Sequence, residues 1–208
     1  KIIYVKIEDL PSYRESFKRQ GMVDWIPENF QRNCIARGFE DIKLTEEDRI
    51  MVSDLDEIPN PITLKNNLHH KEWVSMRQNL YYYFVNCKQK QMWDGTVIAQ
   101  PGTFQTCQQL REARGINPIE GGGWHFSFMG GASRVQQKLQ NIAESNLVKH
   151  KVLGIEDIEN KMNTQTDLFN REEDYAQKEI VELDETFPDC INEFIEKYPD
   201  FFYDKNQF

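Results

Sequence analysis

Short apolar segments alternate along this chain with segments whose apolar residues recur at helical spacing. Residues 47–54 contain three consecutive apolar residues and predict a buried strand, whereas residues 28–39 predict a helix that Gly38 can end. Strands that alternate with helices are typical of a layered α/β domain with a mostly parallel central sheet flanked by helices. Ligands bind such a sheet at the carboxyl ends of its strands, where Asp54 would lie.

The same patterns predict the other elements. Further strands are expected at residues 1–7, 72–86, 96–100 and 124–128, and further helices at residues 60–70, 103–115 and 132–146. Beyond about residue 155 the chain is polar and is predicted to be largely helical. We therefore expect a single domain over residues 1–208, with a core in 1–150 and a helical C-terminal extension in 151–208.

Composition limits the size of the core and the class of partner. With 208 residues, 39% of them hydrophobic, the chain can bury one sizeable core. Its formal net charge of -9 argues against nucleic acid and against an anionic membrane surface, since both are bound by basic patches. No apolar run approaches the roughly 20 residues that span a bilayer, so we expect no membrane segment in this chain. The four cysteines lack zinc-site spacing and predict buried thiols in a reducing compartment.

The stretch "MVSDLDEIPNP" (51–61) places Asp54 and Asp56 directly after a predicted strand. Alternate residues of a strand point to the same face, so the two carboxylates can converge on one point. Neighbouring carboxylates repel each other unless a cation lies between them. Mn²⁺ and Mg²⁺ typically bind one or two carboxylates together with phosphate oxygens, so the pattern suits a metal–diphosphate site. A solvated acidic turn is the alternative.

The stretch "EGGGWHFS" (120–127) is a second candidate site. Its glycines, among them Gly122 and Gly123, let the backbone approach a ligand closely. Trp124 offers a flat face on which a sugar can stack, and His125 is a candidate third metal ligand or phosphate donor. The alternative is a glycine turn into a strand, with Trp124 in the core and His125 hydrogen-bonded.

Arginines of the predicted helix 28–39 form a third candidate. Arg32 and Arg37 can bind a phosphate bidentately, although arginines on helices more often face solvent. The aromatic run "LYYYF" (80–84) is predicted to pack in the core, with sugar stacking as the alternative.

Five segments occur in a specific order along the chain: "QRN" (31–33), "SDLDEIPNP" (53–61), "LYYYF" (80–84), "GGWHFSF" (122–128) and "KLQNIAES" (138–145). In this order they resemble glycosyltransferase family 17, the family of β-1,4-mannosyl-glycoprotein 4-β-N-acetylglucosaminyltransferase. The likeness covers about residues 1 to 150. It implies a GT-A-like nucleotide-sugar-binding fold, a UDP-N-acetylglucosamine donor, and an inverting transfer to a mannose-containing or other glycan acceptor, with Mn²⁺ (or Mg²⁺) at the D-x-D motif.

The resemblance also implies roles for the candidate residues. Asp54 would contact the donor ribose or a metal-bound water, and Asp56 would ligate the metal. Glu57 would orient these aspartates or help to bind the acceptor. His125 would be a metal or phosphate ligand, and Arg32 would contact the nucleotide.

Gly122 and Gly123 would lie against the donor and Trp124 against the acceptor. A carboxylate must deprotonate the acceptor hydroxyl, and Glu144 and Glu120 are both candidates for this base. The family has a histidine-rich stretch where this chain has "IAES", and this departure weakens the transfer of a role to Glu144.

A sugar- or nucleotide-binding module without catalysis is the alternative function. Family members carry a further segment before "KIIYVKI" (1–7), which would include the first nucleotide-binding strand. A two-metal phosphate-ester hydrolase is disfavoured because it needs more His and Asp ligands than this chain offers.

The family's eukaryotic members are anchored in the Golgi, so the Golgi lumen would be the compartment of a member whose anchor has been removed. The cysteine pattern fits a bacterial or viral enzyme of the cytoplasm better.

Overall fold

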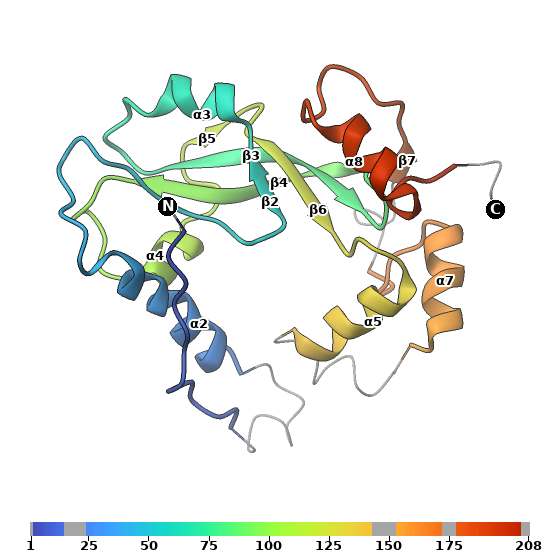
Figure 1. Ribbon diagram of the computed structural model, residues 1–208, viewed down its shortest axis with the longest axis horizontal. Helices are drawn as coiled ribbons and strands as arrows, with labels where there is room; N and C mark the ends of the chain where they lie inside the picture. The colour runs from blue at the N-terminus through green and yellow to red at the C-terminus, as the bar shows by residue number, and fades with distance from the viewer. Residues whose placement is uncertain (1, 15–23, 143–152, 172–177, 205–208) are drawn as a thin grey trace.

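A seven-stranded sheet organises the part of the chain that the computed structural model describes, residues 2–14, 24–142, 153–171 and 178–204 (Figure 1). Its strands are β1 (Ile50–Val52), β2 (Glu57–Pro59), β3 (Val74–Tyr82), β4 (Cys87–Ala99), β5 (Pro118–Ile119), β6 (Gly123–Ser127) and β7 (Lys178–Ile180). The main path through the sheet is β1-β4-β3-β6-β2, while β5 pairs with β3 and β7 pairs with β4.

The sheet is mostly antiparallel, so the predicted parallel sheet is wrong. Only the pairings of β3 with β5 and with β6 are parallel. β3 and β4 form a long hairpin in which Val74 pairs with Ile98 and Asn79 with Met92. The parallel arrangement was predicted because the polar segment that begins at Cys87 was not expected to be a strand. In the structure this segment forms the first half of β4 and pairs with β3. A short turn can join only antiparallel neighbours, whereas parallel strands need a long crossover.

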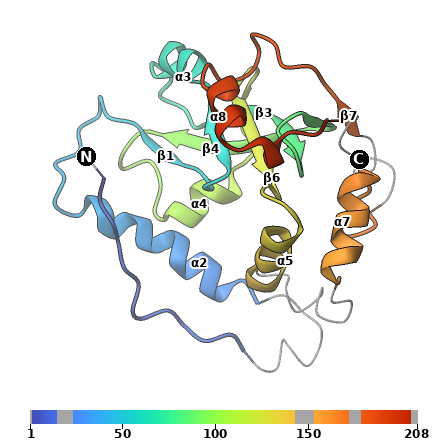
Figure 2. The same cartoon turned by 45° about the vertical axis from the view of Figure 1, so that its right-hand side comes forward.

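Helices cover both sides of this sheet. They are α2 (Ile26–Asn33), continued by the 3₁₀ helix η1 (Cys34–Phe39), α3 (Pro61–Asn67), α4 (Cys107–Glu112), α5 (Ala132–Asn141), α7 (Ile155–Asn163), α8 (Ile191–Lys197) and the 3₁₀ helix η3 (Pro199–Phe201). In Figures 1 and 2, α3 and α8 lie on one side, and α2, α4 and α5 lie on the other. None of the helices in the described residues has the length and apolarity needed to cross a membrane.

Local sequence signals explain why several helices begin where they do. Asn60 caps α3, since its Oδ1 accepts hydrogen bonds from the backbone N–H groups of Ile62 and Thr63 at 2.9 and 3.2 Å. Thr106 caps α4 in the same way, accepting from Gln109 at 3.1 Å. The structure confirms four predicted helices within the described residues, most of them in shorter form: those at 28–39, 60–70, 103–115 and 132–146.

Two predicted strands differ from the structure. Residues 2–7 form no strand, and Ile2 and Tyr4 are 97% and 86% exposed, because no other strand pairs with this apolar run. The predicted buried strand at 47–54 is the short β1, which pairs only with β4 and leaves Met51 exposed. A short apolar run shows that a strand can form, whereas burial depends on the layers that cover it.

The C-terminal residues join the central sheet. They form the helices α7, α8 and η3, but most of the described residues beyond 150 are not helical, so the largely helical extension is confirmed only in part. They also supply β7, in which Ile180 pairs with Cys87 of β4. Phe187 and Ile191 pack against Tyr81 and Trp124 in one of the core clusters. The four cysteines are free thiols, and three of them are buried, while Cys190 is exposed.

Candidate functional site

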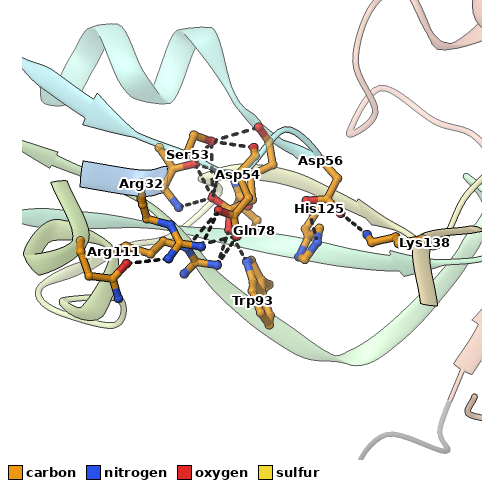
Figure 3. Close-up of polar contacts among 12 residues, drawn as sticks. Arg32, Ser53, Asp54, Asp56, Gln78, Trp93, Arg111, His125 and Lys138 are labelled. Atoms are coloured by element: carbon orange, nitrogen blue, oxygen red, sulfur yellow. Dashed lines mark hydrogen bonds and ion pairs between the residues drawn. The ribbon is translucent and has the colours of Figure 1, made fainter. Parts of the chain in front are cut away.

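The two aspartates of the D-x-D motif lie in the turn between β1 and β2. The backbone N–H of Glu57 donates to the Asp54 carbonyl at 3.1 Å, and the N–H of Phe126 donates to the Asp56 carbonyl at 2.9 Å. Strand alternation therefore does not orient the two carboxylates, contrary to the prediction. Figure 3 shows instead that each carboxylate faces its own set of nitrogen-bearing side chains.

Glu57 is the buried carboxylate that holds this turn in place. Its side chain has no exposed surface. It accepts hydrogen bonds from the backbone N–H groups of Thr96 and Asp54 at 2.8 and 3.1 Å, and from Trp93 Nε1 at 2.8 Å. These bonds tie the turn to β4. The position suits the predicted orienting role and leaves no surface for the predicted contact with an acceptor.

Asp54 is bound by arginines from two helices. Arg111 of α4 donates from Nε at 3.1 Å and also from Nη2, and Arg32 of α2 has its Nη2 3.8 Å away. Arg32 also donates to Gln108 Oε1 at 2.5 Å. The structure thus places Arg32 at the site, as predicted. Arg111 was missed, although it lies inside the predicted helix 103–115, because an arginine on a helix gives no local signal of burial.

Asp56 lies between a lysine and a histidine. Lys138 Nζ of α5 is 2.7 Å from Oδ2, and His125 Nε2 of β6 is 3.4 Å from Oδ1. Burial by itself would raise the pKa of Asp56, but His125 and Lys138 lower it by more, so this pKa lies well below its usual range. His125 Nδ1 is buried and has no hydrogen-bond partner among the described residues.

Trp93 of β4 connects the two aspartate sites. Its indole lies 4.5 Å from the His125 ring, and its Nε1 donates to Glu57. The guanidinium groups of Arg114 and Arg111 lie over the same ring at 4.9 and 5.9 Å. A single tryptophan in the polar run "KQKQMWDG" was the only sequence signal for it.

Two cavities adjoin at the acidic turn. The larger has a volume of about 890 Å³ and is lined by Asp54, Leu55, Asp56, Leu80, Tyr82, Gln89, Trp93, Arg111, His125, Ser127, Phe128, Lys138, Ile142, Phe169 and Arg171. The smaller has a volume of about 800 Å³ and is lined by Leu10, Tyr13, Trp25, Pro27, Glu28, Asn29, Gln31, Arg32, Asp54, Trp93, Gln108, Arg111, Glu112, Arg114, Asn141 and Ile142. Asp54, Trp93, Arg111 and Ile142 line both, so the turn lies at the junction of the two cavities.

The glycines and the tryptophan of the second motif lie outside both cavities. Trp124 is 5% exposed, packs with Tyr81 and Phe187, and donates from Nε1 to the Thr186 carbonyl at 2.9 Å. A Cβ at Gly122 would lie 2.6 Å from the Arg77 backbone nitrogen, and one at Gly123 would lie 2.1 Å from the Ile58 carbonyl oxygen. These glycines therefore serve the packing of neighbouring strands in this structure.

The structure describes one of the two candidate bases, Glu120, but not Glu144. Glu120 lies outside both cavities, its side chain is 71% exposed, and it forms an ion pair with Arg77 Nη1 at 2.9 Å. Glu144 lies outside the described residues, two positions after Ile142, which lines both cavities.

Asp56 and His125 suit a metal ion whose remaining coordination positions are filled by a bound ligand and water. Among the described residues, no group of three or more His, Cys, Asp or Glu side chains is placed to hold a metal ion. Asp56 and His125 nevertheless present a carboxylate and an imidazole to each other, with His125 Nε2 3.4 Å from Asp56 Oδ1. Mn²⁺ accepts both donor types and commonly takes its remaining ligands from phosphate oxygens and water.

Comparison with known proteins gave one result. A family model described as "Glycosyltransferase family 17" matches residues 3–194 of the chain. No curated protein and no solved structure matches.

Proposed function

The chain belongs to glycosyltransferase family 17, and from this premise we propose that it is an inverting, metal-dependent enzyme that transfers N-acetylglucosamine from UDP-N-acetylglucosamine to a hydroxyl group of a mannose-containing or other glycan. The observation that carries this proposal is the position of the acidic turn. It lies where a cavity lined by arginines adjoins a cavity with aromatic walls. Such an arrangement suits a charged donor on one side and a neutral acceptor on the other.

The smaller cavity has the groups that a nucleoside diphosphate needs. Arg111 and Arg114 present guanidinium groups over Trp93, and no described carboxylate forms an ion pair with Arg114. Partial burial lowers the pKa of Arg114, and the positive charge of Arg111 lowers it further, so a bound anion would relieve an unfavourable cluster of charge. Guanidinium groups bind phosphate oxygens bidentately. Tyr13 and Trp25 line the same cavity and offer flat faces to a nucleobase.

Carboxylates also line this cavity. Glu28 accepts a hydrogen bond from the Tyr13 hydroxyl at Oε1, while its buried Oε2 has no partner among the described residues, and Glu112 accepts one from Gln108 Nε2 at 3.0 Å. Neither forms an ion pair with Arg111 or Arg114 in the described structure, so the arginine end is the part of the cavity that favours an anion.

Asp56 and His125 would hold the metal in this proposal. When bound, Mn²⁺ would neutralise negative charge that develops on the leaving diphosphate. Arg111 and Arg114 would act on the same charge from the other side of Trp93. Asp54 pairs with Arg111 and positions that arginine.

The transfer exchanges one bond at the anomeric carbon. The acceptor hydroxyl attacks from the face opposite the diphosphate, its proton passes to a carboxylate, and the bond to the phosphate oxygen breaks, which inverts the stereochemistry. Glu144, which lies outside the described residues, stays the base of this proposal as the family resemblance implies. Glu120 is not kept, since its side chain is exposed and paired with Arg77.

Calorimetric titration of UDP-N-acetylglucosamine tests the proposal. Removing Mn²⁺, or changing Asp56→Asn, should raise the Kd by about tenfold or more. A tenfold change in Kd corresponds to about 1.4 kcal/mol of binding free energy. Asp41→Asn, an exposed carboxylate outside both cavities, is the matched control and should bind like the wild type. UDP should be released when a mannose glycoside is added. Absence of any binding to UDP-sugars would refute the proposal.

A further inference from the structure

Gln89 of β4 is a buried amide whose two polar atoms have no hydrogen-bond partner among the described residues. It is 1% exposed and lies opposite Lys178 of β7. Asn86, a buried amide three positions earlier, uses both of its polar atoms: Nδ2 donates to the Tyr203 carbonyl at 3.0 Å, and Oδ1 accepts from the Tyr203 N–H at 2.9 Å. Proteins rarely leave buried polar side chains unsatisfied, so Gln89 requires an explanation that Asn86 does not.

The position of Gln89 indicates a ligand. It lines the larger cavity together with the aromatic side chains of Trp93, Phe128 and Phe169. Binding sites for small organic molecules have mostly apolar walls and a few polar groups that fix the orientation of the ligand. An amide among aromatic rings matches this description.

The ion pairs of the cationic side chains in the two cavities indicate which cavity suits a neutral ligand. In the larger cavity, Lys138 is paired with Asp56 and Arg171 with Asp167, both at 2.7 Å. In the smaller cavity, Arg114 has no carboxylate partner among the described residues. The nucleotide therefore suits the arginine end of the smaller cavity, with its diphosphate directed to Asp56 and His125 at the junction, and a neutral molecule suits the part of the larger cavity around Gln89.

We propose that the amide of Gln89 recognises two neighbouring hydroxyl groups of the acceptor sugar in the larger cavity. This inference rests on the proposed function, which supplies a sugar as the neutral ligand. A primary amide carries a carbonyl acceptor beside an NH₂ donor, and a hydroxyl group can both donate and accept. A site that leaves such groups unpaired when a hydroxyl is missing discriminates strongly against the deoxy sugar. Gln89 is thus a residue that determines acceptor specificity.

The first experiment compares the stability of two variants. Gln89→Leu removes both polar atoms at similar volume and breaks no hydrogen bond in the described structure, so its Tm should equal or exceed that of the wild type. Asn86→Leu removes two hydrogen bonds, and its Tm should fall by several degrees. An equal fall in Gln89→Leu would mean that the amide has an internal partner, such as a bound water, and would overturn the inference.

The second experiment measures sugar binding. Methyl glycosides of mannose, galactose and N-acetylglucosamine are titrated into the wild type in the presence of UDP and Mn²⁺. At least one should bind saturably, and Gln89→Leu should weaken that binding by about tenfold while its Kd for UDP changes less than about twofold. Removing one recognised hydroxyl from the sugar should weaken binding to the wild type but not to the variant. No binding by any of the three sugars, or equal binding to both proteins, would overturn the inference.

Release of UDP separates this inference from the proposed function. If the wild type transfers sugar and the KM for the acceptor is unchanged in Gln89→Leu, the role of Gln89 is refuted and the function stands. If a methyl glycoside binds through Gln89 but no UDP is released from UDP-N-acetylglucosamine, the function is refuted and the sugar site stands.

Discussion

Glu57 has no exposed side-chain surface, yet it determines where the D-x-D turn lies. Its two oxygens accept from the Thr96 and Asp54 backbones and from the Trp93 indole, so one carboxylate links the turn, β4 and the aromatic wall between the cavities. A buried carboxylate persists only when several donors compensate for its lost hydration. A residue that touches no substrate can therefore control the geometry of those that do.

Replacing Glu57 should reduce both stability and donor binding. Glu57→Gln keeps the shape but turns an NH₂ group toward N–H donors, so we expect a loss of about 2 kcal/mol in the free energy of unfolding. Urea denaturation measures this loss. Binding of UDP-N-acetylglucosamine should also weaken, because Asp54 loses its anchor.

An exposed acid provides the comparison. Glu47→Gln lies on the surface and should leave both quantities unchanged. If Glu57→Gln were as stable as Glu47→Gln, the proposed link between the turn and β4 would be incorrect.

Pairing of the central strands depends on glycine at the start of β6. Gly123 has a φ of +122°, and a Cβ there would lie 2.1 Å from the Ile58 carbonyl of β2. β6 pairs with β2 on one side and with β3 on the other, and it carries His125 toward Asp56. The close approach at this glycine thus sets the position of a candidate metal ligand.

Gly123→Ala should destabilise the protein strongly. Steric overlap with β2 and the positive φ together should cost about 3 kcal/mol or more in the free energy of unfolding. Gly102→Ala is the matched control, since Gly102 also has a positive φ, of +80°, but no atom lies within 4 Å of its added Cβ. That control should lose only about 1 kcal/mol. Equal losses in the two variants, measured by thermal unfolding, would show that strand packing is not the cause.

At the scale of the whole molecule, the site unites segments that are far apart in the chain. Asp54 and Asp56 come from the turn after β1, Arg111 from α4, His125 from β6 and Lys138 from α5. These charges have no such neighbours in an unfolded chain. Folding therefore changes the pKa of Asp56, and the stability of the whole molecule becomes linked to pH.

Acid should destabilise the protein partly through Asp56. His125 and Lys138 hold the pKa of Asp56 in the folded state below its ordinary value, so its protonation favours the unfolded state. Its contribution is fully present above the unfolded pKa and is lost as the pH falls through the folded pKa. Between pH 5 and pH 2, the free energy of unfolding of Asp56→Asn should fall less steeply than that of the wild type. Identical slopes in urea titrations would contradict the lowered pKa that His125 and Lys138 give to Asp56.

The sequence by itself determined what depends on local spacing and residue type. Apolar periodicity and caps located the helices within residues 26–142, and the family resemblance, which the match over residues 3–194 supports, rested on short motifs. The motifs singled out Asp54, Asp56, His125 and Arg32, which the structure brings close together. Each of these signals is contained within a few neighbouring residues of the chain.

Only the tertiary structure decided which segments become neighbours. The antiparallel hairpin of β3 and β4 and the joining of β7 could not be read from local pattern, and the pattern left open whether Trp124 lies in the core or in a site. Arg111, Trp93 and Lys138 acquire their roles from contacts with residues more than 30 positions away, as in the pairing of Arg111 with Asp54 across 57 positions. A periodic pattern shows which face of an element is apolar, but the partner of a charge or a strand depends on the packing of the whole chain.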